Sequence, residues 1–174
     1  MPSPQSLSET DRRIVALWAA DCAERVLHLF EAEAPEDDRA RDGIARARAF
    51  GRGELTAAGE IRRRFEAGRA ANSATSPAAV AAARAAGQAS GVAHMGAHAL
   101  GAAAYAAKAA ELAAPCTRDD EVGWQLEHMT EEVREALRRL PALGTDSAGP
   151  LGAGLLAKGG LGEVIRELQV ALGK

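Results

Sequence analysis

Four polar residues near the start of the chain could form one chemical cluster: Asp21, Glu24, Arg25 and His28. Their spacings of three, four and seven positions place them along one side of a helix. Carboxylates, a guanidinium and an imidazole on one face could bind a partner or contribute metal ligands. The simplest interpretation is an i, i+4 ion pair between Asp21 and Arg25 that orients packing.

A second candidate site contains His94 and His98, which lie four positions apart and share one helix face. Two histidines at this spacing can both reach one metal ion. The same face carries Gly87, Gly91, Gly101 and Tyr105. Because glycines allow another helix to approach closely, we expect this face to be buried despite its polar residues.

The histidine pair leaves three interpretations open. Asp21 or Glu24 on a facing helix could complete a metal site of the helical-bundle type. However, the HExxH pattern is absent, and Glu24 and His28 are one residue too far apart for Glu-x-x-His. The alternatives are a buried polar network whose groups hydrogen-bond to one another, and a direct binding role. No cofactor is predicted.

The charges of the chain are segregated. Residues 39–69 contain nine arginines against four carboxylates, and residues 119–135 contain seven carboxylates against one arginine. A basic patch can bind the phosphates of nucleic acid. This patch lacks interleaved aromatic residues, so solvated faces that partly pair with each other are the expected arrangement. The acidic segment could alternatively bind a cationic partner.

The composition predicts an all-α fold. Alanine accounts for 42 of the 174 residues, and it is the best helix former. β-Branched and aromatic residues, which favour sheets, are few. The chain shows neither a signal-peptide pattern nor an apolar run of membrane-spanning length, so we expect a cytoplasmic protein without membrane contact. Cys22 and Cys116 lie far apart and are expected to be reduced thiols.

Apolar periodicity and helix-breaking residues predict a single bundle of five to six helices. Residues 1–7, which precede the bundle, are expected to be frayed. Ser8, Thr56 and Ser76 are expected N-caps. The longest predicted helix, 77–113, is rich in alanine and central. Residues 1–140 are expected to form the domain, and 141–174 a Gly-rich linker with an amphipathic helix. The expected helices cover residues 8–33, 38–50, 56–71, 77–113, 118–140 and 161–172.

Several stretches resemble a bacterial family of immunity proteins with an immunity-protein-5-like domain, over about residues 10–127. They include WAADCAERVL at 18–27, AAGQA at 85–89, GAAAYAAKA at 101–109 and WQ at 124–125. Such domains are associated with polymorphic toxin systems. The resemblance therefore implies a non-enzymatic protein that binds and neutralises a cognate toxin, and it supplies no catalytic residues.

The candidate binding or structural cluster is Asp21, Glu24, Arg25, His94, His98 and Tyr105. Two other functions remain open at this point. One is a helical metal-binding or metalloenzyme bundle built on His94 and His98. The other is a nucleic-acid-binding module that uses the arginines of 39–69, although nucleic acid is not the partner we expect. A homo-oligomer is compatible with the sequence.

Overall fold

The computed structural model describes residues 2–174, apart from the side chain of Leu155, and this part of the chain is all helical without a strand. The all-α prediction is confirmed, but five to six helices is too low a number. The helices are α1 (Glu9–Glu31), α2 (Arg39–Gly51), α3 (Ala57–Arg63), α4 (Glu66–Arg69), α5 (Pro77–Gly91), α6 (His98–Ala113), α7 (Arg118–Glu127), α8 (Glu131–Arg138) and α9 (Gly159–Ala171), with 3-10 turns at Ala70–Ser73 and Leu155–Ala157.

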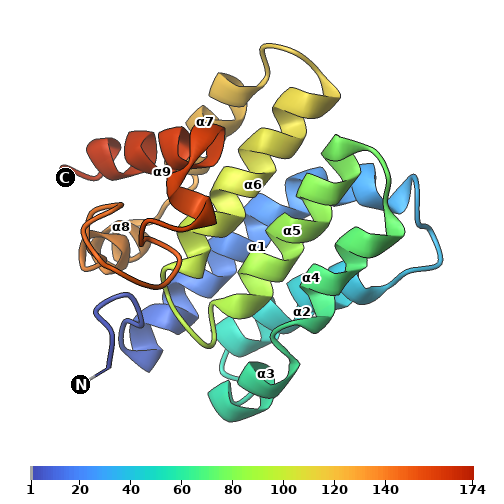
Figure 1. Ribbon diagram of the computed structural model, residues 1–174. Helices are drawn as coiled ribbons and strands as arrows, with labels where there is room; N and C mark the ends of the chain where they lie inside the picture. Colours follow the sequence, from blue (N-terminus) through green and yellow to red (C-terminus); the bar gives the residue numbers. More distant parts are fainter. Residues whose placement is uncertain (1) are drawn as a thin grey trace.

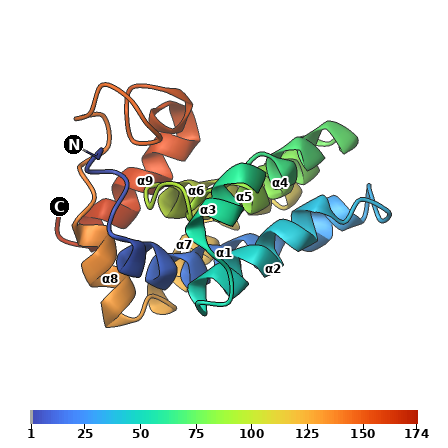
Figure 2. The same ribbon diagram turned by 90° about the horizontal axis from the view of Figure 1, so that it is seen from below.

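The α5–α6 pair lies at the centre of the bundle, with the two helices side by side (Figure 1). Helix α1 packs against both, and α2 packs beside α1 and α5. Figure 2 shows α1 and α2 in one layer with α4, α5 and α6 above them, and both termini at the same end. Helix α4 therefore covers α5, while α7 and α9 pack against α6.

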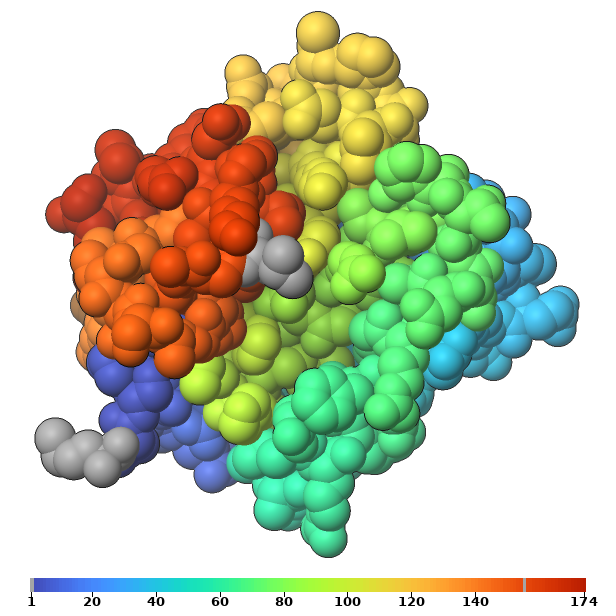
Figure 3. Space-filling model, in the orientation of Figure 1, coloured from blue at the N-terminus to red at the C-terminus, as the bar shows by residue number. Residues whose placement is uncertain are grey.

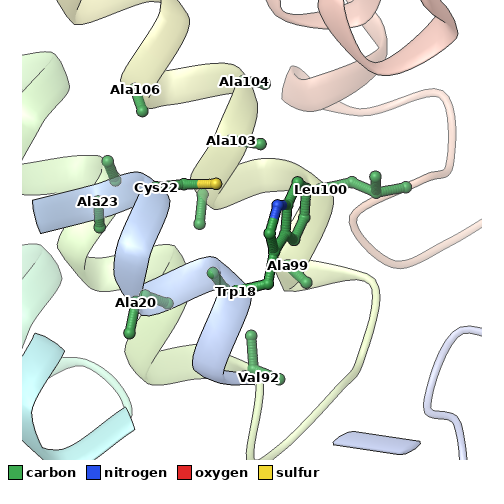
Figure 4. Packing of buried hydrophobic residues seen from close by; sticks show 14 of the residues in the cluster. Trp18, Ala20, Cys22, Ala23, Val92, Ala99, Leu100, Ala103, Ala104 and Ala106 are labelled. Atoms are coloured by element: carbon green, nitrogen blue, oxygen red, sulfur yellow. The ribbon is translucent and has the colours of Figure 1, made fainter. Parts of the chain in front are cut away.

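Alanine sets how closely these helices approach. Trp18 and Cys22 of α1 lie against a surface of α6 made mostly of alanine (Figure 4). The Trp18 indole N–H donates to the Gln125 carbonyl at 3.0 Å, and the Gln125 amide donates to the Ala103 carbonyl at 3.0 Å. These buried hydrogen bonds tie α1, α7 and α6 together where there is little large side-chain area to bury.

The expected long helix 77–113 is wrong: it is two helices, α5 and α6, separated by residues 92–97. This short connection contains no proline, the residue type that would have predicted a break in the helix. Its amides find partners outside the helix, because Gly96 N donates to the Ser6 carbonyl and Ala97 N to the Gln5 carbonyl, both at 3.0 Å. The N-terminal segment thus satisfies backbone groups that the broken helix leaves open.

The expected helix 118–140 is also divided, into α7 and α8, with the break at His128–Thr130. The Thr130 hydroxyl accepts a hydrogen bond from Val133 N, which starts the new helix with a side-chain cap. Arg134 donates to the Leu126 carbonyl at the end of α7. The expected helix 56–71 is likewise divided, into α3, α4 and a 3-10 turn.

The predicted N-caps are confirmed. The hydroxyls of Ser8, Thr56 and Ser76 each accept a hydrogen bond from the amide three residues later. Pro77 follows Ser76 in the first turn of α5, where a missing N–H costs nothing. These short local signals placed three helix starts correctly.

The N-terminal lead is not frayed over residues 2–7, in contrast to the expectation. Gln5 is fully buried, and its amide binds the 141–158 segment through Asp146 Oδ2, the Ala148 carbonyl and Leu151 N. Leu7 takes a φ of 60°. The predicted division at residue 140 stays a prediction, and these contacts cross it.

Candidate functional site

A hollow in the described chain lies between α4, α5 and the start of α6, and we call it the arginine groove. Its volume is about 620 Å³, within the range of ligand-binding pockets. Figure 3 shows the face on which green α4 and α5 meet yellow-green α6. The lining residues are Arg64, Phe65, Gly68, Arg69, Asn72, Arg84, Gly87, Gln88, Gly91, His94, His98 and Tyr105.

Glycines shape the wall of the groove. A Cβ placed on Gly87 would lie 2.7 Å from the Gly68 Cα, so the backbones of α5 and α4 touch at this point. A Cβ on Gly101 would lie 2.2 Å from Gln88 Oε1, so the missing side chain makes room for the Gln88 amide. The prediction that glycines on this face admit a neighbouring helix is met at Gly87, where α4 is that helix.

His98 is half-buried at the start of α6, and its ring contacts Gly91. Its Nδ1 lies 2.8 Å from Gln88 Oε1, which is a hydrogen bond when Nδ1 carries the proton. Burial lowers the pKa of His98 to about 4, with a smaller contribution from His94. His98 is therefore neutral at physiological pH and a weak base.

His94 lies on the connection between α5 and α6 and is exposed. Desolvation lowers its pKa, and the nearby charges of Arg64 and Arg12 lower it further. The His94 and His98 rings are 6.5 Å apart between centroids. The two histidines therefore line one groove, but they do not share a helix face as predicted.

The charges that line the groove are all positive. Arg64, Arg69 and Arg84 line it, and the lining contains no Asp or Glu. The Arg64 guanidinium lies 4.3 Å from the centroid of the Phe65 ring and donates to the Ile61 carbonyl. Arg69 and Arg84 are exposed and have no carboxylate within 4.0 Å anywhere in residues 2–174. This arrangement favours an anionic ligand.

The carboxylates of α1 do not reach this groove. Asp21 and Glu24 both accept hydrogen bonds from Arg48 of α2, at 2.8 and 2.6 Å. This hydrogen bonding lowers the pKa of Glu24. The predicted Asp21–Arg25 pair is wrong, since Asp21 pairs with Arg48 instead.

Arg25 faces a different helix from Asp21. Its Nε lies 2.9 and 3.0 Å from the two carboxylate oxygens of buried Glu121, and its guanidinium lies 4.0 Å from the centroid of the Trp124 ring. The Trp124 ring in turn stacks on His128, with centroids 4.0 Å apart. The predicted cluster is thus divided into three places: the α1–α2 surface, the α1–α7 contact, and the groove with His94, His98 and Tyr105.

This arrangement places Asp21 and Glu24, the carboxylates expected to complete a metal site, away from His94 and His98. No group of three or more His, Cys, Asp or Glu side chains within residues 2–174 is placed to hold one metal ion. The charged neighbours of His94 in the groove are arginines, which repel cations. Cys22 is fully buried and Cys116 exposed, and both thiols are free.

The arginines of 39–69 are mostly neutralised by their own neighbours. Six of them pair with carboxylates of residues 21–66: Arg39, Arg41, Arg46, Arg48, Arg52 and Arg63. Arg46 and Glu60 form a buried pair at 2.8 Å. The expectation that the basic and acidic segments pair with each other is therefore wrong, because these pairs are local. Of the nine arginines, Arg62, Arg64 and Arg69 have no carboxylate within 4.0 Å in the described residues.

The acidic segment keeps part of its charge exposed. Glu121 pairs with Arg25, Asp119 with Arg118 and Glu131 with Arg138. Glu132 and Glu135 on α8 are exposed and have no cationic side chain within 4.0 Å in the described chain. These two carboxylates do not line the arginine groove.

Sequence reasoning missed Arg64, Arg69 and Arg84 as one site. They come from two segments that only the α4–α5 contact brings together. The sequence contains one indication of this site, because Arg84 is the only charged residue between Pro77 and Ala107. Within residues 2–174, no helix has the length and apolar character needed to cross a membrane.

One family model matches the chain. It covers residues 5–132 and is described as "Imm-5 like putative immunity protein". No curated protein and no solved structure matches the sequence. The matched range includes all three arginines of the groove and both of its histidines, and it ends at the start of α8.

Proposed function

The chain belongs to the Imm-5-like immunity protein family, and on this basis we propose that it is a non-enzymatic protein that binds and neutralises a cognate toxin. The family match over residues 5–132 is the observation that carries this proposal. We place the protein in the bacterial cytoplasm, beside a toxin of a polymorphic toxin system. The partner is a protein, with no membrane contact required.

The chemistry of the arginine groove supports binding over catalysis. Its lining contains no Ser, Cys, Asp or Glu that could act as a nucleophile or a carboxylate base. The pKa of His98, lowered to about 4 by burial, makes the imidazole a poor general base at neutral pH. Arginine and tyrosine, by contrast, are the residue types that dominate protein interfaces.

The bundle also supports binding through its rigidity. Close packing of alanine and glycine backbones, as between α4 and α5 at Gly68 and Gly87, leaves little room for the groove to change shape. A surface that is formed before binding avoids the entropic cost of ordering loops. A tight inhibitor of a toxin needs this property.

Co-expression tests the proposal directly. The candidate toxin is the product of a gene that neighbours the gene for this protein, and it is expressed in a bacterial host from an inducible promoter. We expect growth arrest without this protein and normal growth with it. As a control, an unrelated helical protein expressed at the same level should give no protection. Growth arrest that persists despite soluble expression of this protein would contradict the proposal.

A further inference from the structure

The arginine groove has positive charge that the rest of the protein leaves available. Eleven other arginines in the described chain have a carboxylate within 4.0 Å, whereas Arg64, Arg69 and Arg84 do not. Three cations gathered in one hollow without a counter-ion repel each other, which is unfavourable until an anion binds. A bound carboxylate or phosphate relieves this repulsion.

The positive surface extends beyond the groove along α6. A second hollow of about 490 Å³ lies between α6 and the start of α9, and Tyr105 lines both hollows. Lys108 and Lys158 line the second hollow and have no carboxylate within 4.0 Å in the described chain, whereas Arg118 of the same lining is paired with Asp119 and Glu167. Glu111 is the one carboxylate of this lining. The distance along α6 from His98 to Lys108 is about 15 Å, at 1.5 Å per residue. The two hollows together match an extended segment better than a compact small molecule.

This surface stands out because the chain as a whole is acidic, with a net charge of -3. The two hollows are lined by one carboxylate and by five Lys and Arg side chains that have no carboxylate within 4.0 Å in the described chain. Phe65 at the rim is 58% exposed, with the Arg64 guanidinium over its ring. An exposed aromatic ring, a tyrosine and unpaired arginines are typical of the central residues of an interface.

We propose that the two hollows along α6 bind an acidic segment of the partner toxin, with toxin carboxylates paired to Arg69 and Arg84 and the segment passing Tyr105. This inference rests on the proposed function and names the chemistry of the contact. A protein segment fits better than a nucleic acid strand, because the basic segment beside the groove does not offer the continuous run of unpaired cations that a phosphate backbone follows. In that segment, Arg63 and Arg46 are already paired with Asp42 and Glu66.

Charge reversal tests this surface with a matched control. The affinity of the full-length protein for the toxin encoded beside it is measured by calorimetry for the wild type and for Arg69→Glu with Arg84→Glu. Both side chains are exposed, so the double variant should keep the fold, which circular dichroism checks. We expect affinity to fall roughly a hundredfold or more, and wild-type affinity to weaken as salt rises.

The control carries the same charge change elsewhere. Arg62→Glu with Arg166→Glu alters two exposed arginines that line neither hollow and have no carboxylate within 4.0 Å in the described residues. This variant should bind the toxin within about threefold of the wild type, because only long-range charge changes. A comparable loss in both variants would overturn the inference, since it would show a general charge effect.

Two further outcomes separate this inference from the proposed function. If the wild type binds the toxin and Glu132→Lys with Glu135→Lys abolishes binding while the groove variant keeps it, the two exposed carboxylates of α8 belong to the interface and the inference fails alone. If the groove variant instead loses binding to a fluorescent single-stranded oligonucleotide, the surface is a nucleic acid site and the inference fails. Absence of any wild-type binding to the toxin would remove both proposals.

Discussion

The Arg25 guanidinium lies between Glu121 and Trp124: its Nε donates to both Glu121 carboxylate oxygens, and its Cζ is 4.0 Å from the centroid of the Trp124 ring. Glu121 is only 5% exposed, so its charge depends on this partner. Arg25 therefore holds α7 against α1. The residue that the sequence offered as a binding candidate has a structural role in this contact.

Removal of the Arg25 charge should destabilise the protein. We expect Arg25→Met to lower the free energy of unfolding by about 2–3 kcal/mol, because Glu121 loses its partner while it stays buried. Arg25→Lys should cost less, since it keeps the charge but loses the planar contact with Trp124. Urea unfolding measures both. Arg62→Met is the control and should stay within about 0.5 kcal/mol of the wild type. An Arg25→Met variant as stable as this control would contradict the assignment.

The Gly87–Gly68 contact predicts that a single methyl group is not tolerated there. Gly87→Ala should lower the melting temperature, because its Cβ would meet the α4 backbone at 2.7 Å, and we expect a loss of about 1–3 kcal/mol. Gly123→Ala in α7 is the matched control, since a Cβ there meets nothing within 4 Å. Alanine should stabilise that helix by about 0.5–1 kcal/mol. Equal effects of the two substitutions would show that helix propensity, not contact, decides.

His98 predicts a loss of stability in mild acid. Its pKa in the folded protein is about 4, below the ordinary value of 6.5, so the unfolded chain binds the additional proton between these values. The stability that neutral His98 provides is complete above pH 6.5, and it is lost as pH falls toward 4. The maximum loss is roughly 3 kcal/mol.

Urea unfolding of the wild type and His98→Gln at pH 7 and pH 4.5 measures this effect. Glutamine can keep a hydrogen bond to Gln88 and does not titrate. We expect the variant to lose less stability than the wild type between these two pH values, although the carboxylates with lowered pKa, such as Glu33, still contribute in acid. The same pH dependence in both proteins would show that His98 does not gain its proton with unfolding.

The buried side chain of Gln5 should hold the 141–158 segment in place. Its buried amide makes three hydrogen bonds to that segment, so Gln5→Ala leaves Leu151 N and the Ala148 carbonyl without these partners. We expect faster hydrogen exchange and earlier proteolysis within residues 142–157, and a loss of about 1–3 kcal/mol. Exposed Thr10→Ala is the control and should leave the exchange of this segment unchanged. Unaltered exchange in Gln5→Ala would mean that α9 alone holds the segment.

Local sequence signals predicted where three helices start. They did not predict where contacts with distant parts of the chain interrupt the expected helices. The Ser8, Thr56 and Ser76 caps act within three residues, so the sequence shows them directly. The break between α5 and α6 depends on Gln5 and Ser6, about ninety residues away, whose carbonyls accept from Gly96 and Ala97. The pattern of residues within 77–113 cannot show that a distant segment supplies these hydrogen-bond acceptors. Thr130 is a local cap signal of the same kind, and it lies inside the helix expected over 118–140.

The candidate site was predicted in part for the same reason. His94, His98 and Tyr105 were expected on one surface, and all three line the groove, although His94 lies on the α5–α6 connection and not on the expected continuous helix. Spacing alone could not show that Asp21 and Glu24 turn toward Arg48, because that depends on where α2 packs. The arginines of the groove belong to segments whose contact is set by Gly68 and Gly87, and their joint position follows only from the fold.

Titration of the purified toxin with this protein tests the central claim most directly. The toxin that protection on co-expression identifies is purified, and its activity is measured in vitro as this protein is added in increasing amounts. If the protein neutralises the toxin by binding, activity should fall linearly and reach its floor near equimolar protein, and the Arg69→Glu with Arg84→Glu variant should need a large excess. Full toxin activity in the presence of a large excess of folded wild-type protein would contradict the account.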